Sequence, residues 1–215
     1  MRVAQTIILV VCILLVVGFI AGSLTIHIVA TIALPNYNAK LSLAGLKDRV
    51  IVYRDAHAIP HVYAKNEPDL YRAVGYCMAQ DRMWQMDLLR RLCQGRLAEI
   101  FGKELVQTDL LMRALRIPDK SRLMLSRIDS SMKAGLQAYC EGVNQYLRDY
   151  KDKLPPEFKI LRYKPEEWEP EHSAHLVTFM AWNLAFGWQS EVLLHKVCKK
   201  VGEAKFKDLL PDVAA

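Results

Sequence analysis

Paired cysteines are missing from this sequence. Its five cysteines are scattered and odd in number, and no two of them stand in a CxxC arrangement. A disulfide framework, a zinc ribbon and a thioredoxin-like redox motif are therefore not expected. The sequence also lacks a P-loop, a GxGxxG fingerprint, an HExxH helix and a G-x-S-x-G elbow. The sequence therefore has no phosphate-binding loop, metal site or nucleophile–base pair of the kinds that these motifs provide.

A basic stripe interleaved with aromatic residues is also missing, although the net charge is +6. The densest group of lysines, within residues 196–207, alternates with apolar residues and with acidic residues such as Glu203. This pattern is typical of a solvated helix face, so no nucleic-acid partner is expected. The hydrophobic content of 52% is ample for the core of one domain with an appendage.

Charge is absent from a long segment near the N-terminus. Residues 3–39 contain no Asp, Glu, Lys or Arg, and residues 7–20 are continuously apolar. About 20 apolar residues suffice for a helix to cross a bilayer, so residues 1–39 are predicted to form a membrane anchor and linker, with residues 7–30 in the membrane. The alternative is a cleaved signal peptide, with Ala21-Gly22-Ser23 as its cleavage site. The apolar run continues past that site, which favours a retained anchor.

The rest of the chain predicts an α+β fold that is mostly helical and begins with a β-hairpin. Residues 49–55 and 60–64 alternate as strands do, around a turn that contains Ala58. Asn66 is placed to cap the helix that follows. Gly95 and Gly102 each follow a helical pattern and are expected to end one. Further helices are predicted over residues 132–149, 172–188 and 191–210.

Asp81 interrupts an apolar stripe of the first long helix. The stripe recurs at helical spacing and consists of Leu70, Val74, Cys77, Trp84, Leu88 and Leu92. A carboxylate is costly to bury alone, so Asp81 is predicted to be buried and paired with an arginine. The sequence does not choose among the candidates, which are Arg54, Arg82, Arg90, Arg91 and Arg96.

Two groups of residues that include histidine are candidates for function. His57 and His61 flank the turn of the predicted hairpin, where hydrogen bonding within the hairpin is favoured over catalysis. Glu191, His195 and Cys198 stand at positions i, i+4 and i+7, so a helix would place them on one face. A fourth ligand at a standard spacing is missing, which disfavours zinc there.

Several motifs resemble those of the penicillin acylase family of N-terminal-nucleophile hydrolases. Residues 54–64, RDAHAIPHVYA, look like the opening signature RD-x-x-G-x-PHI-x-A of that family. Residues 75–86 are similar to its GY-x-x-AQDR-x-x-QM helix, and the Arg-Arg and GRLAE motifs of residues 90–99 follow in the family's order. The landmarks at residues 168–170 and 182–184 then match as well. The resemblance covers about residues 46–211, and residues 46–215 would form the family's α-chain region.

The resemblance implies an incomplete domain that needs a partner chain. In the family, a precursor cuts itself into an α chain and a β chain, and the N-terminal Ser of the β chain is the nucleophile. This sequence would then supply the α-chain part of a four-layer αββα fold and no catalytic residue. The implied activity is cleavage of the amide bond in an N-acylated small molecule, such as a penicillin, an acyl-homoserine lactone or a similar acyl amide. The resemblance also implies that Glu191 is a ligand of a structural calcium ion, which prefers oxygen donors.

The resemblance further assigns the acyl-binding segment to Ala181, Leu184 and Ala185. Penicillin G acylases have an arginine and a phenylalanine where this chain has Leu184 and Ala185. The pocket is therefore expected to be roomier and to favour aliphatic over phenylacetyl groups. The alternative is that these residues pack in the core. Where the family has a glycine this chain has Ala58, which would be strained if the turn needs a positive φ.

Two other functions stay open at this stage. One is a non-catalytic, membrane-anchored helical binding module that retains the acylase signature, and the other is an unrelated anchored binding domain. For location, we expect a single-pass protein of the cell membrane with its domain facing the periplasm or the exterior. If the N-terminal segment is cleaved, the protein would instead be periplasmic or secreted. The positive charges at Arg2, Lys40, Lys47 and Arg49 lie on both sides of the segment and do not set its orientation.

Overall fold

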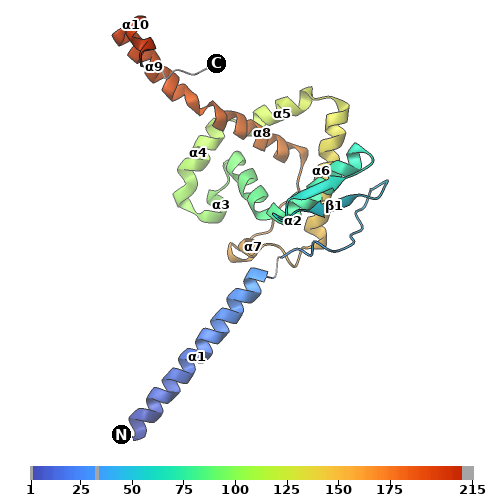
Figure 1. Ribbon diagram of the computed structural model, residues 1–215, viewed down its shortest axis with the longest axis vertical. Coiled ribbons are helices and arrows are strands. Elements are labelled where there is room, and N and C mark those ends of the chain that lie inside the picture. Colours follow the sequence, from blue (N-terminus) through green and yellow to red (C-terminus); the bar gives the residue numbers. More distant parts are fainter. Residues whose placement is uncertain (1, 32–33, 210–215) are drawn as a thin grey trace.

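The computed structural model describes residues 2–31 and 34–209. A helical domain occupies the centre, and two helices project from it in different directions (Figure 1). One is the N-terminal helix α1 (Arg2–Thr31), and the other is α9 (Trp188–Val201), followed by the short α10 (Glu203–Lys207). The chain thus has a body and two appendages.

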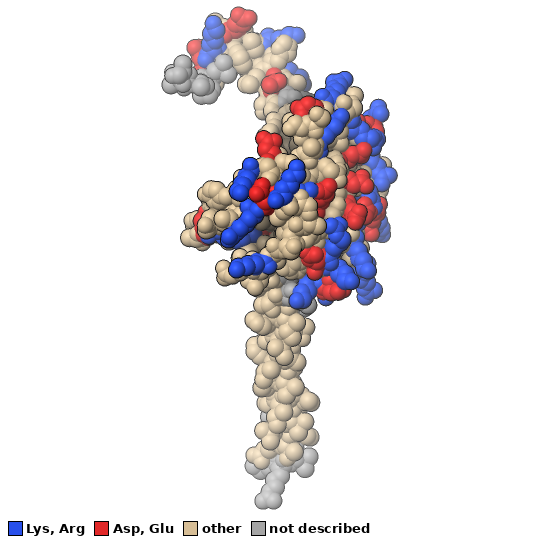
Figure 2. Space-filling view, turned by 90° about the vertical axis from the view of Figure 1, so that its right-hand side faces the viewer, with Lys and Arg blue, Asp and Glu red and all other residues tan. Residues whose placement is uncertain are grey.

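Helix α1 carries almost nothing but apolar side chains. Its segment Gln5–Ile28 is long and apolar enough to cross a membrane, and none of that segment is buried in the protein. The hydroxyl groups of Thr25 and Thr31 donate to carbonyls of the preceding turn, so their polar atoms are satisfied inside the helix. Figure 2 shows it as an uncharged rod below a domain covered with charged side chains. A membrane span and a signal sequence both fit this helix.

The predicted hairpin is confirmed. Strand β1 (Ile51–Arg54) pairs antiparallel with β2 (Pro60–Tyr63), in a register that places Arg54 opposite Pro60. The Asp55 carboxylate closes the turn by accepting from the backbone N–H groups of His57 and Ile59. Ala58 has φ +60°, so the expected left-handed conformation is present where glycine would be less strained.

Helix α2 (Glu67–Gln94) is the central element, and its two ends are as predicted. The Asn66 side chain accepts from the backbone N–H of Asp69, which caps the first turn. Gly95 takes the left-handed conformation with φ 64° and ends the helix. Within the helix, Arg82 has non-helical φ and ψ, which produces a kink.

Helix α6 (Ser130–Asp149) crosses α2 at close range. Glycines stand at the contact on both helices, Gly75 on α2 and Gly142 on α6. The main core lies beside this crossing and includes Met83 and Val143, with Trp168 at its edge. The missing glycine side chains let the two backbones approach, which brings the flanking apolar residues into one cluster.

The face of α2 that packs best is not the one predicted. Tyr76, Ala79, Met83 and Met86 are buried there, whereas most of the predicted stripe from Leu70 to Leu92 is only partly buried. The reason is the position of α6, whose close approach at the glycines selects the adjacent face. The prediction that apolar residues recur at helical spacing was correct, but the prediction of which face of α2 is buried was wrong.

The other helices surround this pair. They are α3 (Ala98–Phe101), the 3-10 turn η1 (Lys103–Leu105), α4 (Val106–Ala114), α5 (Ile117–Arg127), α7 (Pro156–Ile160), α8 (Pro170–Leu184) and the 3-10 turn η2 (Ala185–Gly187). The helix predicted over residues 172–188 is therefore divided, because α8 ends at Leu184 and α9 begins at Trp188. Helices α4 and α5 were not predicted. In the described part of the chain the only sheet is the hairpin, so a mostly helical α+β fold is confirmed for these residues.

Candidate functional site

Asp81 is paired with an arginine, as predicted, and the partner is Arg54 of the hairpin. Its Oδ2 lies 2.7 Å from Nη1 of Arg54, whose guanidinium also donates to the Ala58 carbonyl and to Gln80 Oε1. The Tyr37 hydroxyl donates to the other carboxylate oxygen, and its ring lies 3.8 Å below the guanidinium. The Asp81 side chain is 19% exposed, so it is partly buried where burial was predicted. This cluster joins the linker, the hairpin and α2.

Two carboxylates of α2 are fully buried, Asp69 in its first turn and Asp87 in its second half, and neither was predicted. Asp87 lies among arginines. It accepts from the guanidinium groups of Arg90 and Arg91 and, at 2.7 Å, from the Tyr163 hydroxyl. Arg90 is also completely buried and donates to the backbone carbonyls of Glu166 and Glu167. Asp87 precedes the two arginines by three and four residues, a spacing that would have signalled an ion pair on one helix face.

The GRLAE motif that follows is also structural. Arg96 binds Glu99 and Glu166, with Nη2 to Oε1 of Glu166 at 2.9 Å, so it ties the end of α2 to the segment before α8. Asp109 accepts from the backbone N–H groups of Leu97 and Ala98, each at 2.8 Å. The arginines and acids of the family signature therefore fix helix ends to one another in this chain.

Two buried histidines of α8 lie beside this network. The backbone N–H of Glu169 donates to Nδ1 of His172, and burial lowers the pKa of His172 to about 3, with the charge of Arg90 as the next cause. Burial also lowers the pKa of His175, whose two ring nitrogens have no hydrogen-bond partner. Burial thus favours the neutral form of both rings inside the domain.

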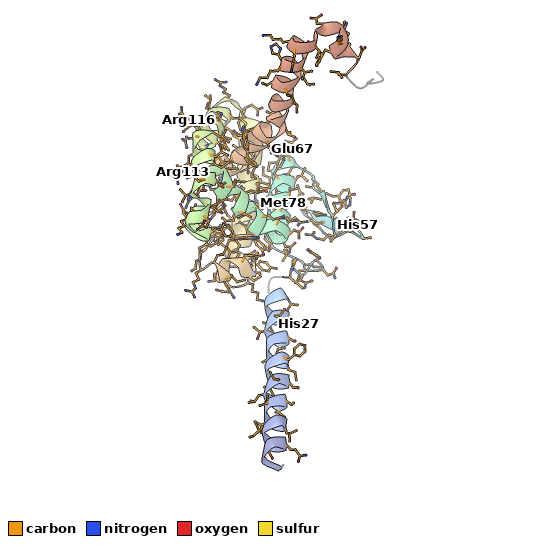
Figure 3. All side chains as sticks on the ribbon, turned by 90° about the vertical axis from the view of Figure 1, so that its left-hand side faces the viewer. His27, His57, Glu67, Met78, Arg113 and Arg116 are labelled. Carbon is orange, nitrogen blue, oxygen red and sulfur yellow. The ribbon has the colours of Figure 1, made fainter. Side chains whose placement is uncertain are left out.

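The remaining histidines are no better placed for catalysis. Figure 3 shows His27 on α1 and His57 on the hairpin. His61 lies 3.3 Å from the Asp55 carboxylate, so it is a hydrogen-bonding residue of the hairpin, as predicted. Ser130 and Lys133 stand at an S-x-x-K spacing, which was not predicted as a site. Both residues are exposed at the start of α6, and within the described ranges no hydrogen bond joins their side chains.

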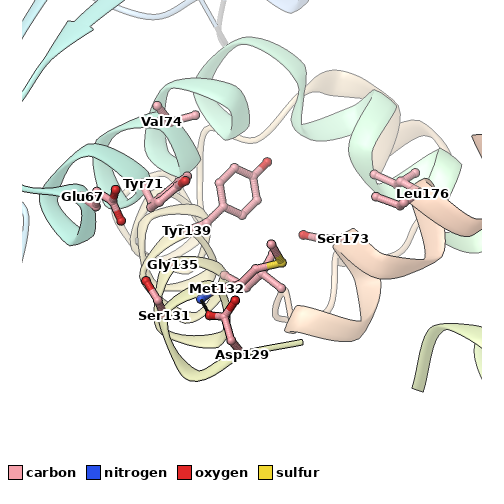
Figure 4. Close-up of a pocket in the computed structure, with 12 residues that line it drawn as sticks. Glu67, Tyr71, Val74, Asp129, Ser131, Met132, Gly135, Tyr139, Ser173 and Leu176 are labelled. Atoms are coloured by element: carbon pink, nitrogen blue, oxygen red, sulfur yellow. Dashed lines mark hydrogen bonds between the residues drawn. The ribbon is translucent and has the colours of Figure 1, made fainter. Parts of the chain in front are cut away.

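A cavity of about 610 Å³ lies between α2, α6 and α8. Its walls are mainly apolar, with Tyr71 and Val74 from α2, Met132 and Tyr139 from α6, and Leu176 from α8 (Figure 4). Gly135 leaves room in the wall, because a Cβ there would meet the Tyr71 ring at 3.0 Å. Polar atoms from Glu67, Asp129, Ser131 and Ser173 also line it. Its size and lining suit an apolar group, and no acid–base pair that could carry out chemistry lines it.

The predicted acyl-binding residues lie beyond this cavity, with Ala181 and Leu184 at the end of α8 and Ala185 at the start of η2. Val177, which lines the cavity, is followed along one face of α8 by Met180, Ala181 and Leu184. Leu184 is 79% exposed, and Ala181 and Ala185 are exposed as well. The structure thus brings the three together at the end of α8 without burying them, so packing in the core is not their role within the described part of the chain.

Glu191 lies exposed in the first turn of α9. His195 on the same helix is exposed too, and across residues 2–31 and 34–209 no group of three metal-binding side chains comes together. Calcium takes six to eight oxygen ligands, so a carboxylate standing alone can supply only part of a site. The calcium assignment stays a prediction.

Comparison with known proteins identifies the family. The penicillin amidase family model matches residues 49–214. The chain is 43% identical over 141 residues to the penicillin acylase 2 proenzyme of Pseudomonas sp. (strain SE83), an alignment covering 66% of this chain and 18% of that protein. It is 36% identical over 169 residues to the acyl-homoserine lactone acylase QuiP of Pseudomonas putida, which covers 79% and 21%. The chain thus spans about a fifth of the length of these relatives.

A solved structure agrees. The thermostable penicillin G acylase from Alcaligenes faecalis superposes with a TM-score of 0.60 at 27% identity, and the match covers 78% of this chain and 94% of the matched chain. The fold and the sequence therefore give the same answer over most of the domain. This chain belongs to the penicillin amidase family and corresponds to its α-chain region.

Proposed function

We propose that this chain is the α-chain portion of an amidohydrolase that cleaves the amide bond of an N-acylated small molecule. The observation that carries the proposal is the family match over residues 49–214. Two relatives are named as a penicillin acylase and an acyl-homoserine lactone acylase, so acyl amides are the common substrate class. Membership alone does not choose between a lactam and a lactone product.

The nucleophile is proposed to be the N-terminal Ser of a β chain released from the same precursor. A serine hydroxyl needs a base, and a free α-amine with a pKa of about 7.7 to 8.0 can take its proton near neutral pH. Two buried thiols of this chain are poor alternatives, because burial raises the pKa of Cys93 and Cys140 to about 12 and favours their protonated form. One relative is named a proenzyme, which agrees with a precursor.

The contribution of this chain to the substrate pocket is proposed to be the exposed end of α8. Ala181, Leu184 and Ala185 present small or aliphatic side chains there, and none of these three is a cation or an aromatic residue. With β-chain residues on the other side, such a wall favours an aliphatic acyl group. Each buried methylene contributes about 0.8 kcal/mol, so chain length should matter several-fold per carbon.

Calcium is proposed to be held by Glu191 together with oxygens of the β chain. The exposed position of the carboxylate on the projecting helix α9 leaves it available to a second chain. A bound calcium would join the two chains and supply no catalytic group.

The location proposed is the cell membrane, with α1 retained as a single-pass anchor and the domain on the side opposite the cytoplasm. The apolar segment Gln5–Ile28 outlasts the small-residue site at positions 21–23. Sequencing the mature N-terminus tests this, since a chain that begins near Leu24 would show that α1 is a signal peptide.

The test of the activity uses the product of the whole coding sequence. Two chains should appear after expression, the larger beginning with Ser, and the processed protein should release acyl groups from C6 to C12 acyl amides, a range on the order of what such a pocket holds. Replacing Leu184→Arg and Ala185→Phe together should shift kcat/KM towards phenylacetyl amides. The control Leu193→Arg, on the exposed surface of α9, should not.

The same assay separates the rival function. A protein that is never processed and hydrolyses no acyl amide would be the non-catalytic, membrane-anchored module. A processed enzyme whose best substrate is a phenylacetyl amide would leave the amidohydrolase standing and refute the aliphatic pocket.

A further inference from the structure

The end of the domain nearest α1 carries an exposed isoleucine among unpaired cations. Helix α7 lies there, close to the C-terminal end of α1 (Figure 1). Ile160, the last residue of α7, is 70% exposed. No sequence motif predicted this surface. It is separate from the proposed acyl-binding end of α8 and from the proposed calcium ligand Glu191.

The position of α7 relative to α1 follows from direct contacts. The backbone N–H of Leu34 donates to the carbonyl of Thr31, the last residue of α1, at 3.1 Å. Leu34 and Pro35 then line one hollow together with Pro155 and Pro156, at the start of α7. The domain therefore begins immediately at the end of α1, with α7 beside it.

A membrane around α1 would reach the level of α7. The segment Gln5–Ile28 has 24 residues, which at 1.5 Å each is about 36 Å and slightly exceeds a hydrocarbon layer of about 30 Å. Thr31 is less than one helical turn beyond Ile28, so it lies within the headgroup layer, which is roughly 5 to 8 Å thick on each side. Pro155 and Pro156 line the same hollow as Leu34, so the start of α7 lies near that layer.

The charge of this region is suited to an anionic surface. Residues 148–164 contain three acidic residues and six basic ones. The six are Arg148, Lys151, Lys153, Lys159, Arg162 and Lys164, and all are exposed. Within the described ranges none of them forms an ion pair with a carboxylate, in contrast to Arg54, Arg90 and Arg96. Unpaired basic side chains beside an apolar one are typical of segments that lie on a lipid surface.

The turn is held in place by aromatic packing below it. Phe158 is buried against Trp84, with ring centroids 5.5 Å apart, and against Tyr163 at 5.2 Å. Arg162 has φ +57°, a conformation that reverses the chain after Ile160. Ile160 is thus presented outward by a fixed support.

We propose that α7 and the turn after it, residues 156–164, rest on the lipid headgroup layer beside α1 and bind anionic lipid headgroups. Ile160 enters the interface, and Lys159, Arg162 and Lys164 contact the headgroup charges. This inference rests on the proposed retention of α1 as an anchor. Two attachments fix the tilt of the domain, which a single flexible tether would leave free.

The experiment places a photo-crosslinking amino acid at position 160 of the full chain in lipid nanodiscs. A matched label at Leu123, which is 52% exposed on α5, is the control. The label at 160 should form lipid adducts, several-fold more of them when anionic lipid is included with the zwitterionic lipid. The label at 123 should form few in either membrane.

A pair of charge reversals tests the role of the cations. Lys159→Glu with Lys164→Glu should reduce the adducts at 160 several-fold, whereas Lys199→Glu with Lys205→Glu, on α9 and α10, should not. If the chain is inserted in the nanodisc, either of two results would overturn the inference. One is that adducts at 160 do not exceed those at 123, and the other is that adducts at 160 do not respond to anionic lipid. Failure to enter the nanodisc, or a mature N-terminus near Leu24, would instead overturn the anchor.

Discussion

Replacement of Gly142 by alanine is expected to disrupt the packing of α2 on α6. A Cβ at this position would lie 2.0 Å from the carbonyl oxygen of Arg72 and 2.9 Å from the backbone nitrogen of Tyr76. Both atoms belong to the backbone of α2, so no side-chain rotation can relieve the contact. The two helices would have to separate by about 1 Å or more to restore van der Waals distance.

The cost follows from the core that this separation opens. Overpacking typically costs about 1 to 3 kcal/mol, and a contact between two backbones should lie at the upper end. Alanine regains about 1 kcal/mol through its better helix propensity, so the net loss in the free energy of unfolding should be about 2 kcal/mol or more. Tyr76 and Val143, which flank the crossing, would lose part of their packing.

The assay is thermal unfolding of the detergent-solubilised full chain, followed by circular dichroism at a helical wavelength. Two alanine controls grade the effect. Gly135→Ala meets only the Tyr71 ring at 3.0 Å, a side chain that can move, and should cost less. Gly187→Ala meets no atom within 4 Å and should leave the transition unchanged or slightly raised. If Gly142→Ala unfolds at the same temperature as the Gly187→Ala control, the proposed backbone contact is wrong.

Three further predictions rest on single side chains. Asp81→Ala should lower the free energy of unfolding by about 1 to 3 kcal/mol, which is less than for a fully buried ion pair. The double variant Arg54→Ala, Asp81→Ala should lose no more stability than the sum of the two single variants. Unchanged stability of Asp81→Ala would contradict this prediction. Burial lowers the pKa of His172 to about 3 in the folded protein, whereas the usual pKa of about 6.5 applies when the chain is unfolded. The unfolded state therefore takes up a proton below pH 6.5 and the folded state does not, so the protein loses stability as the pH falls below 6.5. The loss should be about 2 kcal/mol at pH 5. Denaturant titrations from pH 7.5 to pH 4.5 should show that loss in the wild type, and a His172→Gln variant with the same slope would exclude His172 as its source. Glu191→Ala should remove calcium from the processed protein, as measured by atomic emission after dialysis. The control Glu203→Ala, on α10, should retain calcium. Equal calcium contents of the two variants would show that Glu191 is not a ligand.

The sequence by itself determined the local structure of this protein and its family. The hairpin, the Asn66 cap and the Gly95 end were all predicted correctly, because each depends on residues only a few positions apart. The apolar character of α1 was also evident, since length and composition alone identify a helix that can span a membrane. The family signature was recognisable for the same reason, as a series of short motifs in order.

Only the tertiary structure decided which groups meet across the chain. It decided that Arg54 is the partner of Asp81 and that Asp87 is fully buried, and both outcomes depend on elements that pack from distant positions. The buried face of α2 also lies next to the predicted stripe and not on it, because Gly75 and Gly142 let α6 approach on the neighbouring side. Helical periodicity specifies that one face is apolar, but the free energy of burial depends on which surface the next helix covers, and that information lies in long-range contacts.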